Sequence, residues 1–220
     1  MKISVFCTLA LMVGLLFIAQ PAAAQSNDPA LLSSIDRLNA TPAVRSPDFK
    51  ENGYIFSTRI LDTNRQLVGY VRDMLIYSSG EMAYVDGEIT RARSGSPRRL
   101  YAADNVTFLE DISSWEVPLE NFNDNISRNN LFELQAMVGA EVKDISGGWV
   151  GKVKYVLMDK EARIIKALVL NEVPGASRYD DVAIPFMTEY VTIMKRYDRI
   201  EFRLDRAMAQ TVKDFARERF

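Results

Sequence analysis

The sequence predicts a mainly β protein, with two small β-barrels and a C-terminal α-helix. An internal duplication, a series of short apolar segments separated by turn residues, and an amphipathic final segment support this. At a shift of 82 positions, Thr58–Tyr77 aligns with Ala140–Asp159 without a gap. Repetition on this scale indicates two related units. Small sheets avoid exposed edges most economically by closing, so we expect each unit to be a barrel.

Five positions carry the same residue in both copies, which supports the duplication. They pair Asp62 with Asp144, Val68 with Val150, Gly69 with Gly151, Val71 with Val153 and Leu75 with Leu157. A chance alignment would rarely match the glycine, its flanking valines and the apolar run that follows. We expect Asp62 and Asp144 to accept hydrogen bonds from turn amides, as aspartate does in hairpin loops.

Residues 1–24 have the three parts of a secretory signal peptide. Lys2 is the only charge before Asp28, an apolar stretch spans Ile3–Ala19, and three alanines end at Ala24. We expect cleavage after Ala24 and export, most simply to a bacterial periplasm. The competing interpretation is an uncleaved membrane anchor, because the apolar run is close to the length that spans a bilayer.

Polar stretches divide the rest of the chain into four segments. We expect a flexible N-terminal segment at 25–53, a divergent first barrel at 54–120, a linker at 121–133 and a second barrel with the closing helix at 134–220. The segment 25–53 is rich in Ser, Asn and Pro, and we interpret it as a tether although a weak helix could form at Pro29–Leu38.

The second copy predicts its strands in order. These are Ala140–Lys143, Val150–Met158, Arg163–Asn171, Val182–Ile184, Tyr190–Met194 and Ile200–Leu204. Ser146–Gly148 has the chemistry of a tight turn. Asp205 is placed to cap a helix in which Met208, Val212 and Phe215 share one face.

Several of these segments together resemble the PRC-barrel family, which includes the cytoplasmic domain of the photosynthetic reaction-centre H subunit. They are Val138–Val142, Val150–Val153, Val156–Asp159, Val182–Phe186 and Arg199–Phe202. The resemblance covers about 134–220 well, whereas the first copy matches only in its opening hairpin. It implies a small barrel used for docking and assembly, with no shared catalytic residue.

Composition excludes several functions. Lys and Arg total 27 against 29 Asp and Glu, so no basic field favours nucleic acid. The chain has no histidine, which removes Ser-His-Asp catalysis and His-ligated metals, and its one cysteine, Cys7, lies in the signal segment. Gly147–Lys152 is one residue short of a phosphate loop, and Asn129 stands where a calcium loop that starts at Asp124 needs glycine. We predict a non-enzymatic module without cofactor or metal.

Two features are candidate contacts for a partner, most simply another protein at the cell envelope. Trp149 puts a large ring at a barrel rim, either packed on the neighbouring barrel or exposed for a partner. Arg91, Arg93, Arg98 and Arg99 form a loop without acids, suited to an acidic partner or weakly to anionic lipid, or else simply solvated.

Three questions stay open at this level. Trp115 has the same two interpretations as Trp149, and packing is favoured. An anchored assembly factor is one alternative function, and an acid-based hydrolase working between the barrels is another. The sequence does not decide the oligomeric state.

Overall fold

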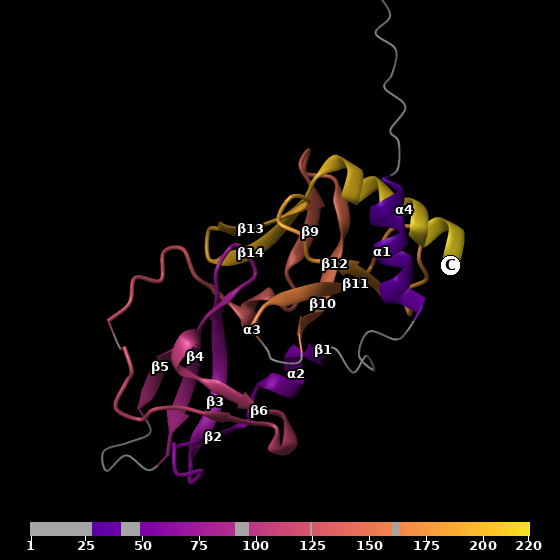
Figure 1. Cartoon of the computed structure of the whole chain (residues 1–220). Coiled ribbons are helices and arrows are strands. Elements are labelled where there is room, and N and C mark those ends of the chain that lie inside the picture. The colour runs from indigo at the N-terminus through magenta and orange to yellow at the C-terminus, as the bar shows by residue number, and fades with distance from the viewer. Residues whose placement is uncertain (1–27, 41–48, 91–96, 124, 160–162) are drawn as a thin grey trace, which may run out of the picture.

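The computed structural model describes residues 28–40, 49–90, 97–123, 125–159 and 163–220. The signal-peptide prediction for 1–24 therefore lies outside the described residues. The chain is mainly β, with two seven-stranded sheets, one of them a half-barrel, and a C-terminal helix. Figure 1 shows the sheets as two lobes, with helices α1 (Pro29–Ala40) and α4 (Arg206–Arg219) beside the second.

The second sheet contains the strands that its sequence predicts. In hydrogen-bonded order they are β12 (Val182–Pro185), β11 (Ile165–Asn171), β10 (Trp149–Asp159), β9 (Glu141–Asp144), β14 (Arg199–Leu204) and β13 (Val191–Arg196). Neighbours are antiparallel except β14 and β9, which run parallel. Asp205 caps α4 by accepting the Met208 amide at 2.7 Å, and Met208, Val212 and Phe215 are buried, as predicted.

The first sheet repeats this order. Its strands are β5 (Arg98–Ala102), β4 (Met82–Ile89), β3 (Leu67–Ile76), β2 (Arg59–Leu61), β7 (Ser114–Glu116) and β6 (Thr107–Leu109), and β2 and β7 are parallel. Single 3-10 turns lie at Ala103–Asn105 and Glu110–Ile112. The duplication therefore extends through the whole unit, beyond the hairpin in which it is visible from sequence.

The turns of the two copies agree in atomic detail. The Oδ1 atoms of Asp62 and Asp144 each accept the backbone N–H groups two and four residues ahead, as predicted. Arg65 and Gly147 hold the same turn position with φ of 59° and 94°. Glycine adopts this left-handed region without steric cost, so the second turn is the less strained.

Each copy is preceded by an arm that pairs with the other copy. β1 (Phe49–Glu51) and the short helix α2 (Asn52–Ile55) precede the first copy, yet β1 pairs with β10. β8 (Phe132–Glu133) and the short helix α3 (Leu134–Met137) precede the second copy, yet β8 pairs with β3. The 82-residue shift also relates the two contacts, because Glu51 pairs with Leu157 and Glu133 with Leu75. The units are interlocked by exchanged arms and share one continuous core.

The copies also meet directly around a local two-fold axis. Beyond the β3–β4 and β10–β11 turns the shift becomes 83, because Met82 pairs with Ile76 and Ile165 with Met158. Glu81 and Ile164 are therefore equivalent residues, and they form a β-bridge with each other. Met82 N–H donates to Arg163 O at 2.7 Å, and Ile165 N–H donates to Gly80 O at 2.8 Å. Rotation about the axis exchanges these two bonds, so the chain is a covalent pseudo-dimer.

The described part of 25–53 differs from the tether that we expect. α1 forms where only a weak helix was considered, and its Leu31 and Ile35 are buried. The Asn39 amide bonds both backbone groups of Ala183 on the edge strand β12, at 2.7 and 2.8 Å. These contacts hold the helix in place, and they cover an otherwise open sheet edge.

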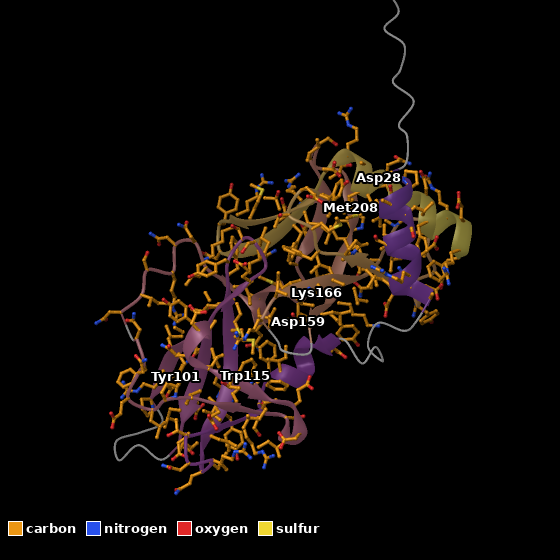
Figure 2. All side chains as sticks on the ribbon, in the orientation of Figure 1. Asp28, Tyr101, Trp115, Asp159, Lys166 and Met208 are labelled. Carbon is orange, nitrogen blue, oxygen red and sulfur yellow. The ribbon has the colours of Figure 1, made fainter. Side chains whose placement is uncertain are left out.

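The segment predicted as a linker, 121–133, has a matching role on the first unit. Asn123 N–H donates to Leu100 O on edge strand β5 at 2.9 Å, and β8 belongs to the first sheet. Trp115 lies on β7, is fully buried and packs on Phe108, so the favoured packing interpretation is confirmed. Figure 2 shows Trp115 and Tyr101 within the first unit.

Candidate functional site

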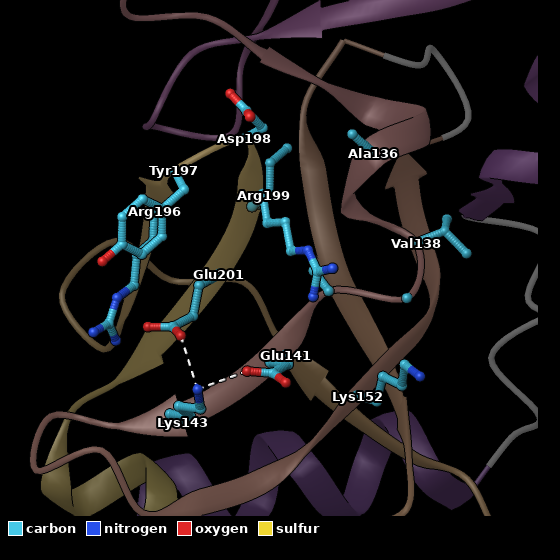
Figure 3. Close-up of a pocket in the computed structure, with 13 residues that line it drawn as sticks. Ala136, Val138, Glu141, Lys143, Lys152, Arg196, Tyr197, Asp198, Arg199 and Glu201 are labelled. Carbon is cyan, nitrogen blue, oxygen red and sulfur yellow. Dashed lines mark hydrogen bonds and ion pairs between the residues drawn. The ribbon is translucent and has the colours of Figure 1, made fainter.

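A groove of about 470 Å³ opens on the outer face of the second unit. Strands β9, β10 and β14, α3 and the β13–β14 turn supply its lining: Ala136, Val138, Gly139, Ala140, Glu141, Lys143, Lys152, Arg196, Tyr197, Asp198, Arg199, Ile200 and Glu201. Figure 3 shows ten of these residues by name. The groove therefore depends on residues about sixty positions apart in the sequence.

Strand register explains why these side chains meet. Cross-strand partners point to the same face of a sheet. One row runs Lys152, Glu141, Glu201 and Met194 across β10, β9, β14 and β13, and the next runs Trp149, Lys143, Arg203 and Thr192. The parallel pairing of β9 with β14 is what places two glutamates side by side.

A tight ion network occupies the centre of this face. Lys143 Nζ lies 2.6 Å from Glu141 Oε2 and 3.0 Å from Glu201 Oε2, and Arg203 Nε donates to Glu201 Oε1 at 2.6 Å. Hydrogen bonds to Glu141 and then to Glu201 raise the pKa of Lys143. Burial acts to raise the pKa of Glu201, but the bonds from Lys143 and Arg203 outweigh it, so that pKa is lowered. Each of these two shifts favours the charged form, so Lys143 and Glu201 are ion-paired at neutral pH.

Three further cations line the groove outside this network. Lys152, Arg196 and Arg199 form no ion pair with any residue that the structure describes. In Figure 3 the Arg199 side chain extends into the middle of the groove, between Glu201 and Val138. Asp198 is the one lining acid outside the network, so the groove offers net positive charge to a ligand.

The rim adds exposed aromatic surface. Tyr197, at the tip of the β13–β14 hairpin, is 91% exposed, and Trp149 is 36% exposed. A second hollow of about 260 Å³, lined by Leu75, Leu131 and Ile200 among others, lies between the units. Both hollows include Tyr197, Asp198 and Arg199, so the hairpin tip stands between them.

Trp149 lies on the groove face of its own unit. It pairs with Lys143, and its Nε1 donates to Glu172 O at 3.2 Å. The arm strand β1 joins β10 at the other end, beside Leu157–Asp159. The ring is therefore partly exposed on its own unit, and its role as a partner contact stays a prediction.

The arginine loop falls into two parts. Arg91 and Arg93 lie outside the described residues. Arg98 makes a two-point ion pair with Asp86, at 2.6 and 3.1 Å, and the Arg99 guanidinium lies 3.6 Å from the Phe122 ring centroid. Arg98 and Arg99 hold the first unit together, and the structure does not bring them near Trp149.

Asp73 and Asp86 form a buried acidic pair beneath the linker arm. Asp73 accepts the Met74 and Gln135 amides at 2.7 and 3.1 Å, and burial raises its pKa to about 6. Asp86 is 1% exposed, and the guanidinium of Arg128, in the segment just before the arm, lies 4.0 Å from its carboxylate. These contacts identify the pair as an anchor for the arm.

The chemistry of the groove suits binding better than hydrolysis. A glycosidase-type acid needs a raised pKa, whereas the pKa of Glu201 is lowered and both network glutamates are held by Lys143. Within the described ranges, no group of three His, Cys, Asp or Glu residues could hold a metal ion.

Sequence reasoning missed Lys143, Lys152, Arg196, Arg199 and Glu201. Charges alternate with apolar residues in Glu141–Lys143 and in Arg199–Arg203, which marks them as solvent-facing strand positions. The sequence carries no sign that the two segments pair in parallel.

Comparison with known proteins finds no relative of this chain among protein families or curated proteins. No protein-family model matches the chain, and no curated protein matches it. Over the part of the chain that the structure describes, no helix is both long and apolar enough to cross a bilayer.

Proposed function

We propose that this protein is an exported docking or assembly module that binds an acidic segment of a partner protein in the groove over β9, β10 and β14. The observation that carries the proposal is the trio Lys152, Arg196 and Arg199, which line an open groove and have no carboxylate partner among the residues that the structure describes. Arginine forks bind carboxylates well and steer acidic partners toward a surface.

The surroundings of the cations support a protein ligand. Tyr197 in the groove lining and Trp149, which pairs with Lys143 on the same sheet face, are both exposed. Tyrosine and tryptophan are enriched at binding hot spots. The ion network beneath them supplies a preorganised floor, since Lys143 and Arg203 already hold Glu201.

The proposed fold family is the PRC barrel and the proposed location is the periplasm. The family rests on the resemblance of 134–220 and on the mainly β two-sheet fold, and the location rests on the signal-like pattern of 1–24. The intact mass of the protein extracted from the envelope separates cleavage from anchoring, because cleavage removes the first twenty-four residues.

Titration with fluorescein-labelled poly-L-glutamate tests the binding. We expect wild-type affinity to fall as NaCl rises from about 50 to about 300 mM, and Arg196→Glu/Arg199→Glu to bind at least about tenfold more weakly. Lys166→Glu is the matched control, because Lys166 is exposed on β11 outside the groove. Equal binding by the double variant and the control would refute the proposal.

Photo-cross-linking in cells would identify the partner. A photoreactive residue at Tyr197 should form an adduct that the Arg196→Glu/Arg199→Glu background loses. The same residue at Tyr179, which is 78% exposed but lines no part of the groove, should not form it. Identical adducts from both positions would contradict docking in the groove.

A further inference from the structure

Strand β13 presents an open sheet edge beside the groove. Among the described strands it pairs only with β14, and it ends the hydrogen-bonded order of its sheet. It is six residues long, whereas its counterpart β6 in the first unit has three. Short edge strands discourage pairing with other chains, and β13 lacks that protection.

The backbone groups on this edge follow from the hairpin. Arg196 pairs with Arg199 across a two-residue turn, and residues that flank such a turn exchange hydrogen bonds. The alternation continues to Asp205 N–H, which donates to Tyr190 O at 2.8 Å. The N–H and C=O groups of Ile193 and Lys195 therefore face outward. The outward N–H of Val191 is already used, since it donates to Met187 O at 2.8 Å.

Charge around the edge selects the chemistry of a partner strand. Lys195 Nζ donates to the backbone carbonyl of Arg128 at 3.3 Å, and no carboxylate of the described chain pairs with it. Arg196 and Arg199 stand at the end of the same hairpin and form no ion pair within the described ranges, and Asp198 is the one acid in the turn. The edge is therefore complementary to carboxylates.

We infer that the partner segment binds as an added strand on β13, with acidic side chains toward Arg196 and Arg199. Side chains alternate between the two faces of a strand, so its other residues point toward the hollow lined by Leu75, Leu131 and Ile200. Main-chain hydrogen bonds to Ile193 and Lys195 would set its direction and register. This inference rests on the proposed function and specifies how the acidic segment lies.

An eight-residue peptide of alternating Glu and Val, labelled with fluorescein, provides the test with the full chain. The matched peptide has N-methyl groups on alternate residues, which remove main-chain donors without changing charge. We expect it to bind about tenfold more weakly, because about two hydrogen bonds are lost. Lys195→Pro removes one outward donor of β13, and we expect it to bind more weakly than Lys195→Ala, which matches the loss of charge.

The outcomes separate the inference from the proposed function. Equal binding of both peptides, together with weaker binding by Arg196→Glu/Arg199→Glu, would overturn strand addition and leave acidic docking standing. Absence of binding by either peptide, with poly-L-glutamate still bound, would mean that Lys195 and Arg196 only keep other strands away, and would also overturn it. Circular dichroism of Lys195→Pro and Lys195→Ala checks that both remain folded.

Discussion

The two units share a scaffold but differ on one face. Where the second unit has Glu141, Glu201, Lys152 and Trp149, the equivalent positions of the first have Arg59, Ser114, Tyr70 and Leu67. The first face has one charged residue among these four, and the second has three. Strand order, turn capping and arm exchange are common to both units, so they belong to the fold. The difference teaches that the charged residues on which the proposed docking depends belong to the second face alone.

The largest effect should come from breaking the contact between the N-terminal helix α1 and the second unit. Ile35→Asp places a charge in the buried contact between α1 and the second unit, and we expect it to lower the free energy of unfolding by at least about 3 kcal/mol. Urea unfolding measures the change, and hydrogen exchange should show the loss first in β11 and β12. The neighbouring exposed Asp36→Ala should change stability by less than about 1 kcal/mol. Equal stability of Ile35→Asp and wild type would show that α1 is not an integral part of the second unit's core.

The buried acid of the first unit should make stability pH-dependent. Because burial raises the pKa of Asp73 to about 6 from 3.8, the folded state holds this proton more tightly than the unfolded chain does. The stabilisation is fully present below pH 3.8 and is lost as pH rises through about 6. The stability of wild type relative to Asp73→Asn should fall by about 3 kcal/mol over this window. A pH-independent difference between the two proteins would show that Asp73 is not the titrating group.

The ion network of the second unit should make stability depend on pH in the opposite direction, with stability lost as the pH falls. Lys143→Met removes one partner of buried Glu201 and should cost about 1–3 kcal/mol at neutral pH. The pKa of Glu201 is lowered in the folded state, so its stabilisation is present above the ordinary glutamate value and is lost as pH falls. Thermal unfolding should show that the cost of Lys143→Met shrinks on acidification. If Lys143→Met destabilised the protein equally at low pH, Lys143 would contribute through packing and not through its charge.

The smallest change in stability should come from substituting Trp149. The same substitution allows fluorescence to compare the tryptophans of the two units. Trp149→Phe removes one hydrogen bond to Glu172 O and should cost about 1 kcal/mol or less. The tryptophan left is Trp115, which is fully buried, so fluorescence should shift to the blue and resist acrylamide. Strong quenching of Trp149→Phe would place Trp115 at the surface and overturn the packing of the first unit.

Local signals account for the part of the fold that the sequence predicts. Asp62 and Asp144 cap turns, Asp205 caps α4, and apolar runs mark β10 and β11, because each of these depends on residues close together in the chain. The arm exchange could not be predicted, since β1 and β8 are two or three residues long and carry no sign of which copy they join.

The site was harder to predict because its residues come from strands that are far apart in the sequence. Trp149 was identified as a lone ring on a rim, but its neighbours Lys143 and Arg203 join it only through pairings of β9 with β10 and β14. Arg98 was a candidate contact because its loop lacks acids. Its partner Asp86 is twelve residues earlier, on the adjacent strand.

The comparison between the two faces can be tested most directly by NMR. The ¹⁵N-labelled protein would be titrated with the Glu-Val peptide, and amide shifts would be mapped onto both units. The account predicts shifts at Val138–Lys143, Lys152 and Arg196–Glu201, with none at the equivalent Arg59, Tyr70 and Ser114. Shifts of equal size on both faces, or on the first alone, would contradict a docking site confined to the second unit.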